Sequence, residues 1–287
     1  MKWNNKPIVV PQMNSILDKP DTSPPKGLVD PAGAAKRIRL ATFAPSAPLL
    51  PLVEYFWLVE WDLTGQPPQT QRVLPYPNAH MVFELGRTAI HGVVRGAFVR
   101  KLEGAGRVLG VRFRPGGLRG LIQQPMTRLT DRTMPLDDVL RVSTAQAEVS
   151  VLSARSDLEM VAAAESLLLA ARPVPDPRAA LAEQAVLAAA ATNGPLSTGA
   201  LAIQVDMEER SLQRLFSNYV GVSPKWVIQR FRLQEATSRL ATPGPVALAA
   251  LAAELGFFDQ AHLTRSFTAL VGMAPLAYWK TQQAASS

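Results

Sequence analysis

Hydrophobic positions in the last third of the chain recur with the period of an α-helix. Between Glu208 and Tyr219, the apolar face of the predicted helix consists of Leu212, Leu215, Phe216 and Tyr219. A second stretch, from Asp259 to Val271, has an apolar face made of Leu263, Phe267, Leu270 and Val271. The sequence therefore predicts two amphipathic helices that bury similar faces and expose polar ones.

The two predicted helices lie within a repeat. The identical pairs Leu212/Leu263, Arg214/Arg265, Phe216/Phe267, Val220/Val271, Gly221/Gly272 and Pro224/Pro275 all share one offset in the numbering. A repeat at a fixed offset indicates a duplicated supersecondary unit. A shorter predicted helix precedes each copy, Ser197–Val205 and Ala247–Leu255, so each copy has the order of a helix-turn-helix. Between the copies, Ser223 and Pro224 are typical of the N-cap and first position of a helix, and we expect that long helix to run to Leu240.

Strand-like segments dominate from Ile38 to about Pro115, where aromatic and β-branched residues are separated by turn residues. The predicted strands are Val53–Trp61, Arg72–Leu74, His80–Leu85, Ala89–Val94, Gly96–Leu102 and Val108–Phe113. Many short strands with regular turns favour a small β-barrel or sandwich. The helices predicted after them are Leu118–Gln124, Leu136–Val142, Ala145–Leu152, Leu158–Ala171 and Arg178–Thr192.

Prolines suggest where the parts of the chain meet. Residues 1–37 hold several prolines among polar residues, so we expect an extended, poorly ordered segment there. The prolines of residues 173–177 block helix continuation and stiffen a spacer. We therefore expect a β-barrel domain with trailing helices at 38–172, a linker at 173–177 and a helical domain at 178–287.

Composition narrows the class of protein. The net charge of +7 suits a polyanionic partner, and the excess of arginine over lysine suits bidentate contacts to phosphate or guanine. The chain has no cysteine, which excludes disulfides, thiolate metal sites and cysteine nucleophiles. No apolar run approaches the roughly 20 residues that a bilayer span needs, and no secretory signal is visible. We therefore expect a cytoplasmic protein that does not contact membranes.

From about Pro195 to Lys280, the sequence resembles the AraC/XylS family of bacterial transcription regulators. The motifs that carry this resemblance are Leu212-Gln213-Arg214-Leu215-Phe216, Gly221-Val222-Ser223-Pro224, Arg232-Leu233 with Glu235-Ala236, Gly256-Phe257 with Asp259-Gln260, and Phe267 with Val271-Gly272 and Pro275. The resemblance implies two helix-turn-helix units joined by the long helix, with Glu208–Tyr219 and Asp259–Val271 as recognition helices that enter successive major grooves. Ala261 departs from the family pattern, where a polar residue is more typical.

Upstream, three segments resemble a sensor-type domain that is found fused to such DNA-binding domains. They are Tyr55-Phe56-Trp57, Pro75-Tyr76-Pro77-Asn78 with Met81-Val82-Phe83, and residues 110–117. This resemblance implies a cupin-like β-barrel. The predicted fold class is therefore α+β, with an N-terminal small β-barrel (cupin-like) and trailing helices, followed by an all-α domain with two helix-turn-helix units.

The polar faces of the recognition helices supply the candidate base contacts, which are Arg210, Ser211, Gln213, Arg214, Gln260, Ala261, Thr264 and Arg265. Arg214 and Arg265 are the sharpest candidates, because a guanidinium on guanine O6 and N7 is the commonest specific contact. Gln213 and Gln260 suit adenine, although Gln213 and Thr264 could equally face phosphate or solvent. The candidate phosphate contacts, at the start of the long helix, are Ser223 and Lys225.

The strands supply candidates for an effector pocket, which are Trp57, Trp61, Tyr76, His80 and Phe83; plain core packing is the alternative for these side chains. His80 and His91, with Glu84 nearby, come nearest to a metal site, but no close ligand pair such as H-x-H is present. We therefore expect no metal and no cofactor. We expect His262, beside the buried Leu263, to be a packing residue of its helix. No catalytic triad, phosphate loop or carboxylate pair is present, so we expect no enzyme activity.

These observations predict a sequence-specific transcription regulator controlled by a small-molecule effector bound to the N-terminal domain. The expected partners are double-stranded DNA and an effector of unknown identity, with RNA polymerase and a second copy of the chain as further candidates. Two alternatives stay open. One is a metal-dependent cupin-type enzyme that carries a DNA-binding appendage, and the other is an architectural DNA binder that responds to no ligand.

Overall fold

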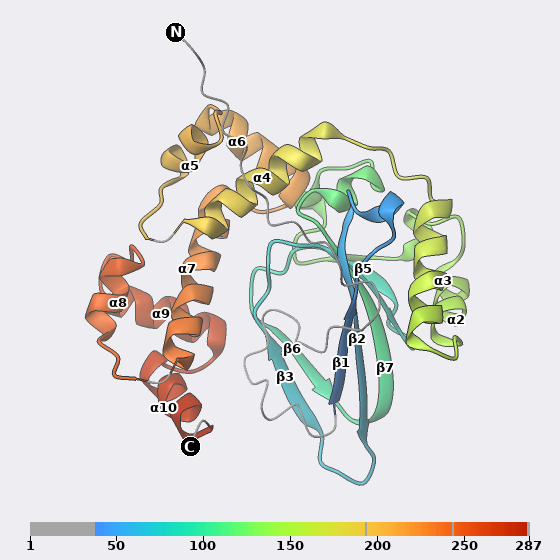
Figure 1. Ribbon diagram of the computed structural model, residues 1–287, viewed down its shortest axis with the longest axis horizontal. Coiled ribbons are helices and arrows are strands. Elements are labelled where there is room, and N and C mark those ends of the chain that lie inside the picture. Colours follow the sequence, from blue (N-terminus) through green and yellow to red (C-terminus); the bar gives the residue numbers. More distant parts are fainter. Residues whose placement is uncertain (1–37, 193, 243, 286–287) are drawn as a thin grey trace.

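The computed structural model describes residues 38–192, 194–242 and 244–285, so the predicted extended segment 1–37 lies outside the described residues. A β-rich half comes first in the chain and a helical half follows it (Figure 1). This order confirms the predicted α+β class. No helix in the described part of the chain is long and apolar enough to cross a membrane.

An antiparallel sheet of six strands forms the centre of the β-rich half, in the order β1-β2-β7-β4-β5-β8. These strands are β1 (Ile38–Phe43), β2 (Val53–Leu63), β4 (His80–Glu84), β5 (Ala89–His91), β7 (Gly104–Phe113) and β8 (Thr133–Met134). A separate two-stranded sheet pairs β3 (Gln69–Val73) with β6 (Phe98–Leu102). The described strands do not close into a barrel, because β3 and β6 pair only with each other and the large sheet ends at the two-residue strand β8.

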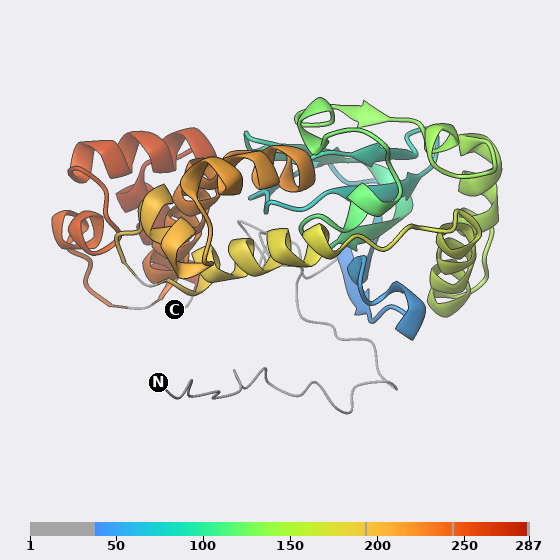
Figure 2. The same cartoon turned by 90° about the horizontal axis from the view of Figure 1, so that it is seen from above.

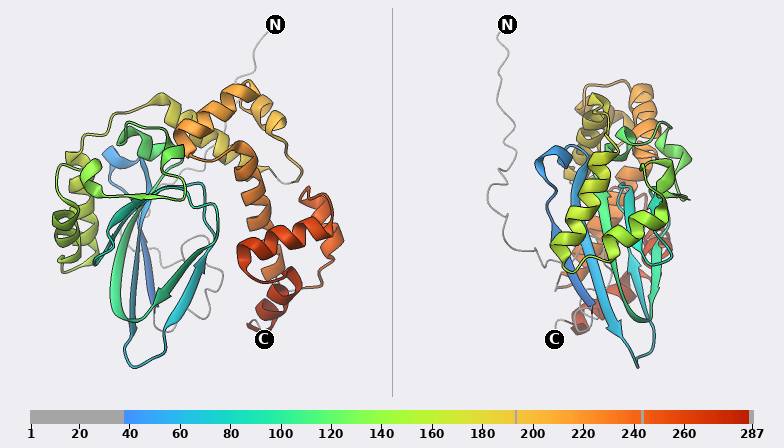
Figure 3. Two further views of the ribbon diagram at one scale, coloured as in Figure 1. Left: turned by 180° about the vertical axis from the view of Figure 1, so that it is seen from behind. Right: turned by 90° about the vertical axis from the view of Figure 1, so that its right-hand side faces the viewer.

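Two helices cover one face of the large sheet, α2 (Thr144–Leu152) and α3 (Asp157–Ala170). Both begin at serine N-caps, and Ser143 also forms a capping box with Gln146. Between this face and the helices lies the main hydrophobic core, which includes Phe56, Leu58, Met81, Phe83, Leu109, Val111, Val151, Met160 and Leu168. Figure 3 shows the helices along the side of the sheet that faces away from the helical half.

The helices predicted at Leu118–Gln124 and Leu136–Val142 are short 3₁₀ turns instead, at Gly117–Gly120 and Leu136–Asp138. A further 3₁₀ turn lies at Met126–Arg128. The two glycines that bound the first turn disfavour a longer helix. The turns at Gly117–Gly120 and Met126–Arg128 matter because they lie next to the helical half, whereas Leu136–Asp138 packs beside α2.

The opposite face of the large sheet is directed toward β3, β6 and the helical half, which lies beside them (Figures 1 and 2). The helices of that half are α4 (Pro177–Ala191), α5 (Thr198–Gln204), α6 (Glu209–Leu215), α7 (Pro224–Ala241), α8 (Leu248–Glu254), α9 (Gln260–Val271) and α10 (Pro275–Ala285). The long helix α7 contributes to two cores: Val227 and Ile228 pack in the first helix-turn-helix unit, and Leu233 and Leu240 pack in the second.

Candidate nucleic-acid interface

The first predicted recognition helix is present, but it has two parts. The α-helix α6 continues as a π-helical turn, Phe216–Val220, before the chain reverses at Gly221. Leu212 and Phe216 are fully buried, as their spacing predicts. Gly221 has φ 95°, so the predicted left-handed cap is confirmed. The π-helical turn has no signal in the sequence.

The second recognition helix is regular. α9 starts at the N-cap Asp259, whose carboxylate accepts a hydrogen bond from the His262 amide at 2.6 Å, and it ends at Gly272 with φ 87°. Leu263 and Phe267 are fully buried against the second core. Both units therefore present one polar helix face away from their cores.

Most of the predicted base-contact residues lie exposed on these two faces. Arg210, Gln213, Arg214, Gln260, Ala261 and Arg265 are exposed, whereas Ser211 and Thr264 are half-buried. In the first unit, Gln213 Nε2 donates to Glu209 Oε1 at 3.1 Å and Arg214 Nη2 donates to Ser211 Oγ at 3.5 Å. These bonds are weak and local, so both side chains are free to turn toward a ligand.

A cleft of about 640 Å³ lies between the two units, near the N-terminal ends of both recognition helices. Its lining includes Ser197, Thr198, Glu209, Lys225, Arg232 and His262. Lys225, a predicted phosphate contact, is exposed at this cleft. The hydroxyl of Ser223, the other predicted phosphate contact, accepts a hydrogen bond from the Trp226 amide at 3.2 Å and so caps α7.

In the β-rich half, a row of polar side chains crosses the face of the sheet that is directed toward the helical half. Tyr55 on β2 is opposite Arg112 on β7, Arg112 is opposite His80 on β4, and His80 is opposite His91 on β5. Adjacent strands bring directly opposite side chains into contact distance. Four chemistry-bearing residues from four strands are thereby aligned, although only His80 was a predicted pocket residue.

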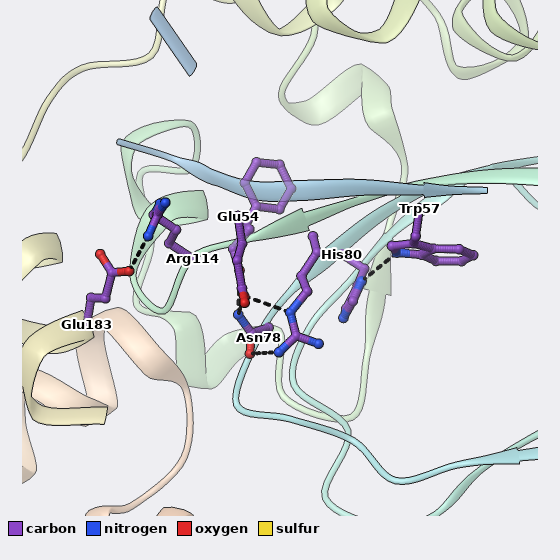
Figure 4. A network of polar contacts seen from close by, with 8 residues as sticks. Glu54, Trp57, Asn78, His80, Arg114 and Glu183 are labelled. Carbon is purple, nitrogen blue, oxygen red and sulfur yellow. Dashed lines mark hydrogen bonds and ion pairs between the residues drawn. The ribbon is translucent and has the colours of Figure 1, made fainter. Parts of the chain in front are cut away.

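Arg112 is the centre of this row and is only 5% exposed. Its Nε donates to Glu54 Oε2 at 2.7 Å and its Nη2 donates to Asn78 Oδ1 at 2.9 Å, which compensates the buried charge (Figure 4). The guanidinium carbon also lies 4.7 Å from the centre of the Tyr76 ring and 5.4 Å from that of Tyr55.

His80 is held neutral by its surroundings. Burial, with the positive charge of Arg112 and the proximity of His91, lowers the pKa of His80 to about 3. Its Nδ1 accepts a hydrogen bond from Trp57 Nε1 at 3.2 Å (Figure 4). Burial also lowers the pKa of His91. In the described residues, no group of three or more His, Asp or Glu side chains is placed to hold a metal ion.

Four of the five predicted effector-pocket residues lie on the same side of the sheet. Trp57, Trp61 and His80 are on the face directed toward the helical half, and Tyr76 lies beside Arg112. The Trp57 ring lies directly against Gly110, since a Cβ there would come within 2.0 Å of Trp57 Cε2. Phe83 is not with them: it is fully buried on the opposite face, in the core under α2 and α3.

The sequence did not predict how closely the two halves contact each other. The Thr130 hydroxyl donates to the Gly221 carbonyl at 2.5 Å, at the end of the first recognition helix. Tyr76 lies edge-to-face with Phe231 of α7 at 6.2 Å between ring centres.

Two arginines extend this contact. Arg114, directly after β7, pairs with Glu183 of α4 at 2.6 Å (Figure 4). Arg230 of α7 is 4% exposed, donates to the Arg95 carbonyl at 2.5 Å, and has its pKa lowered to about 10 by burial.

Two family comparisons match separate parts of the chain. Residues 201–281 match a helix-turn-helix domain family, and residues 41–135 match a family described as a domain of unknown function (DUF6597). The first match covers both duplicated units and the long helix between them. A comparison with curated proteins gives no match.

Solved structures with some likeness are bacterial proteins. One is a transcriptional regulator with an AraC-type DNA-binding domain from Chromobacterium violaceum, 25% identical, which covers 34% of this chain and 88% of that chain with a TM-score of 0.32. Another is ToxT from Vibrio cholerae, 12% identical, covering 75% of this chain and 97% of that chain with a TM-score of 0.36. A further ToxT structure, with unsaturated fatty acid bound, is 11% identical over 85% of this chain and 95% of that chain, with a TM-score of 0.35.

Proposed function

We propose that this chain, whose helical half is an AraC/XylS-type helix-turn-helix domain, is a transcription regulator that recognises a specific DNA site through both units and answers to a small-molecule effector. The observation that carries the proposal is the exposed pair Arg214 and Arg265. The two arginines occupy the same position in the repeat, each on the polar face of a recognition helix whose other face is buried. A major-groove helix needs such a face to reach base edges.

A direct test replaces each arginine by alanine in the full chain and measures binding to a duplex selected from a random-sequence pool. Arg214→Ala and Arg265→Ala should each reduce discrimination between selected and random duplexes by about 1–3 kcal/mol, because one bidentate base contact is lost. Unchanged discrimination in both variants would contradict the proposal.

Arg141→Ala is the matched control, because it removes an exposed arginine from the β-rich half. The same charge is lost, so any effect of net charge on DNA affinity is matched. Discrimination should be unchanged. Lys225→Ala should instead weaken binding to all sequences alike and lower the salt slope by about 1, as expected for one phosphate contact.

We propose that the effector site uses the face of the sheet that carries Trp57, Trp61 and His80, together with Tyr76. An apolar surface with a few converging polar groups suits a small molecule. Tyr76 contacts both Arg112 and Phe231 of α7, so a ligand that moved it would bias the helix that joins the two units. Phe83 is fully buried on the other face, and we assign it to packing.

The proposal places the protein in the cytoplasm and treats it as a non-enzyme, with RNA polymerase and a second copy of the chain as further partners. It also keeps the expected boundaries at 38–172, 173–177 and 178–287. Metal analysis of the purified full chain tests the rival enzyme: stoichiometric metal that His80→Ala removes would favour that rival. Thermal-shift screening with a metabolite library tests the architectural binder, which predicts no hit.

A further inference from the structure

The two helix-turn-helix units have separate cores and face each other across the cleft described above. Helix α7 is the element they share. A single helix can bend or twist, so the distance between two recognition helices depends on contacts that hold the units against it. A direct contact of this kind between the two units lies beside the cleft.

That contact is made by Arg232, in the middle of α7. Its Nη2 donates to the Leu196 carbonyl at 2.7 Å, directly before the N-cap of α5 in the first unit. Its Nη1 donates to the Gly256 carbonyl at 2.9 Å, in the turn between α8 and α9 of the second unit. One planar guanidinium therefore binds a backbone carbonyl of each unit, which fixes direction as well as distance.

Backbone packing at the same point leaves little freedom. Gly256 has φ +73°, and a Cβ there would come within 2.9 Å of Pro195 Cα and 3.2 Å of Arg232 Cζ. Pro195 belongs to the start of the first unit and Gly256 to the turn of the second. The two units therefore touch through backbone where the guanidinium joins them.

We infer that Arg232, with Pro195 and Gly256, forms a strut that sets the separation of the two recognition helices, and so the spacing at which this chain binds two half-sites on one duplex. The spacing part rests on the proposed DNA-binding function. Arg232 is a positioning residue in this inference. Its two Nη groups donate to backbone carbonyls of the protein, and the inference gives it no contact to a base.

The affinity of two rigidly joined helix-turn-helix units depends strongly on the number of base pairs between their half-sites. B-DNA turns once in about 10 base pairs, so one inserted base pair rotates the second half-site by about 35°. A rigid pair of units cannot follow that rotation, whereas a loosely joined pair can.

The first test needs no DNA. The chain has no cysteine, so Ile203→Cys on α5 and Ala269→Cys on α9 give two exposed positions for spin labels in the full-length protein. The label-to-label distance distribution should be narrow in this background. Arg232→Met should broaden it by about twofold or more, because the two hydrogen bonds by which one guanidinium joins the units are lost.

Arg239→Met is the matched control for this measurement. Arg239 is an exposed arginine of the same helix, and it pairs with Glu235 of α7 and Glu254 of α8 without bridging the units. Its distribution should stay narrow. Equal widths in Arg232→Met and the parent would overturn the inference, whatever the DNA experiments show.

The second test uses the selected duplex and versions of it with one or two base pairs inserted between the half-sites. The parent protein should lose about tenfold or more in affinity per insertion, and Arg232→Met about threefold or less. The inference is contradicted if the parent binds the duplexes with insertions as tightly as the selected duplex. It is also contradicted if Arg232→Met loses as much affinity per inserted base pair as the parent does. If Arg214→Ala and Arg265→Ala leave discrimination intact, the proposed function fails. The label-to-label distances then still test whether Arg232 fixes the separation of the two units.

Arg232→Lys covers the case in which the methionine variant does not fold, which circular dichroism melting would reveal. Lysine keeps the charge and most of the stem, but its single ammonium group lacks the fork that reaches both carbonyls. It should broaden the label-to-label distance distribution and reduce the loss of affinity per inserted base pair, both by less than Arg232→Met does. A lysine variant that matches the parent in both measurements would overturn the inference.

Discussion

The two helix-turn-helix units of this protein are built from one repeated pattern and yet differ in what surrounds them. Leu212 and Leu263 are both fully buried, as are Phe216 and Phe267. The first unit ends in a π-helical turn and is bonded to the β-rich half by Thr130, whose hydroxyl donates to Gly221. The second ends as a regular α-helix.

A single pair of positions illustrates the difference. Tyr219 in the first unit donates its hydroxyl to Asp176, just before α4, and lies 5.8 Å beneath the Arg119 guanidinium. At the same position of the repeat, the second unit has Leu270, which packs in its own core. The comparison teaches that both units keep the same buried face and an arginine at one exposed position, while they contact the β-rich half differently. Thr130 is hydrogen-bonded to Gly221 in the first unit, whereas Leu74 packs in the core of the second unit and Arg72 lies against Gly272.

The largest expected effect comes from the glycines that end the two recognition helices. Gly221→Ala should lower the free energy of unfolding by about 3 kcal/mol, because the left-handed backbone is strained and the new Cβ meets the Met126 carbonyl and Thr130 at 3.0 Å. Gly272→Ala should cost about 1 kcal/mol, since its new Cβ meets only the flexible end of Arg72. Urea unfolding of the full chain measures both; equal losses would break the comparison.

Acid should act on the β-rich half before it acts on the second unit. His80 has a folded pKa of about 3, below its value near 6.5 in the unfolded chain, so the unfolded state binds the proton first. The stabilisation is therefore complete above about pH 6.5 and is lost as the pH falls toward 3, with about 2 kcal/mol gone at pH 5.

Urea unfolding at a series of pH values tests this expectation. His80→Gln keeps an acceptor for the Trp57 indole N–H and does not titrate, so its stability should fall less between pH 7 and pH 5. At pH 5, hydrogen exchange should become faster at the backbone amides around Tyr76 and Phe231 before it becomes faster in α9. Parallel pH curves for parent and variant would show that His80 is not the group responsible.

The smallest expected change in stability comes from substitutions at Tyr219 and at the matching position of the second unit, Leu270. Tyr219→Phe removes the hydroxyl bonded to Asp176 and should cost about 1 kcal/mol, with the ring still packed. Leu270→Met is the control at the matching position, because it conserves volume and should cost about 1 kcal/mol or less. In hydrogen exchange, Tyr219→Phe should expose the start of α4 and the π-helical turn, whereas Leu270→Met should affect only the second unit. Loss of protection in both units from either change would contradict the comparison.

Much of the helical half was predictable from local rules. Ser197 and Ser223 are N-caps whose hydroxyls accept amide hydrogen bonds, and Gly221 and Gly272 have the positive φ expected of left-handed caps. These features depend on a few neighbouring residues, and the period of the apolar positions supplies the rest. The π-helical turn was not predictable, since the same spacing of apolar positions forms a regular α-helix in α9.

The β-rich half was predictable only in outline. The strands around Trp57, His80 and Val111 were expected, but the pairing that aligns Arg112 with His80 and His91 depends on register between strands distant in sequence. The same register places Phe83 on the opposite face from Trp57. A small β-barrel or sandwich was expected from the many short strands, and the described strands do not close into a barrel because β3 and β6 pair with each other alone.

By itself, the sequence determined the duplicated unit, the exposed polar faces of its two recognition helices and the α+β order of the chain, because these follow from periodicity and capping within short stretches. Only the tertiary structure decided that Arg232 joins Leu196 to Gly256, that Arg112 is buried between two tyrosines and that the β-rich half contacts the first unit at Gly221. Those contacts join residues far apart in the chain, and no local pattern encodes a partner that folding alone brings near.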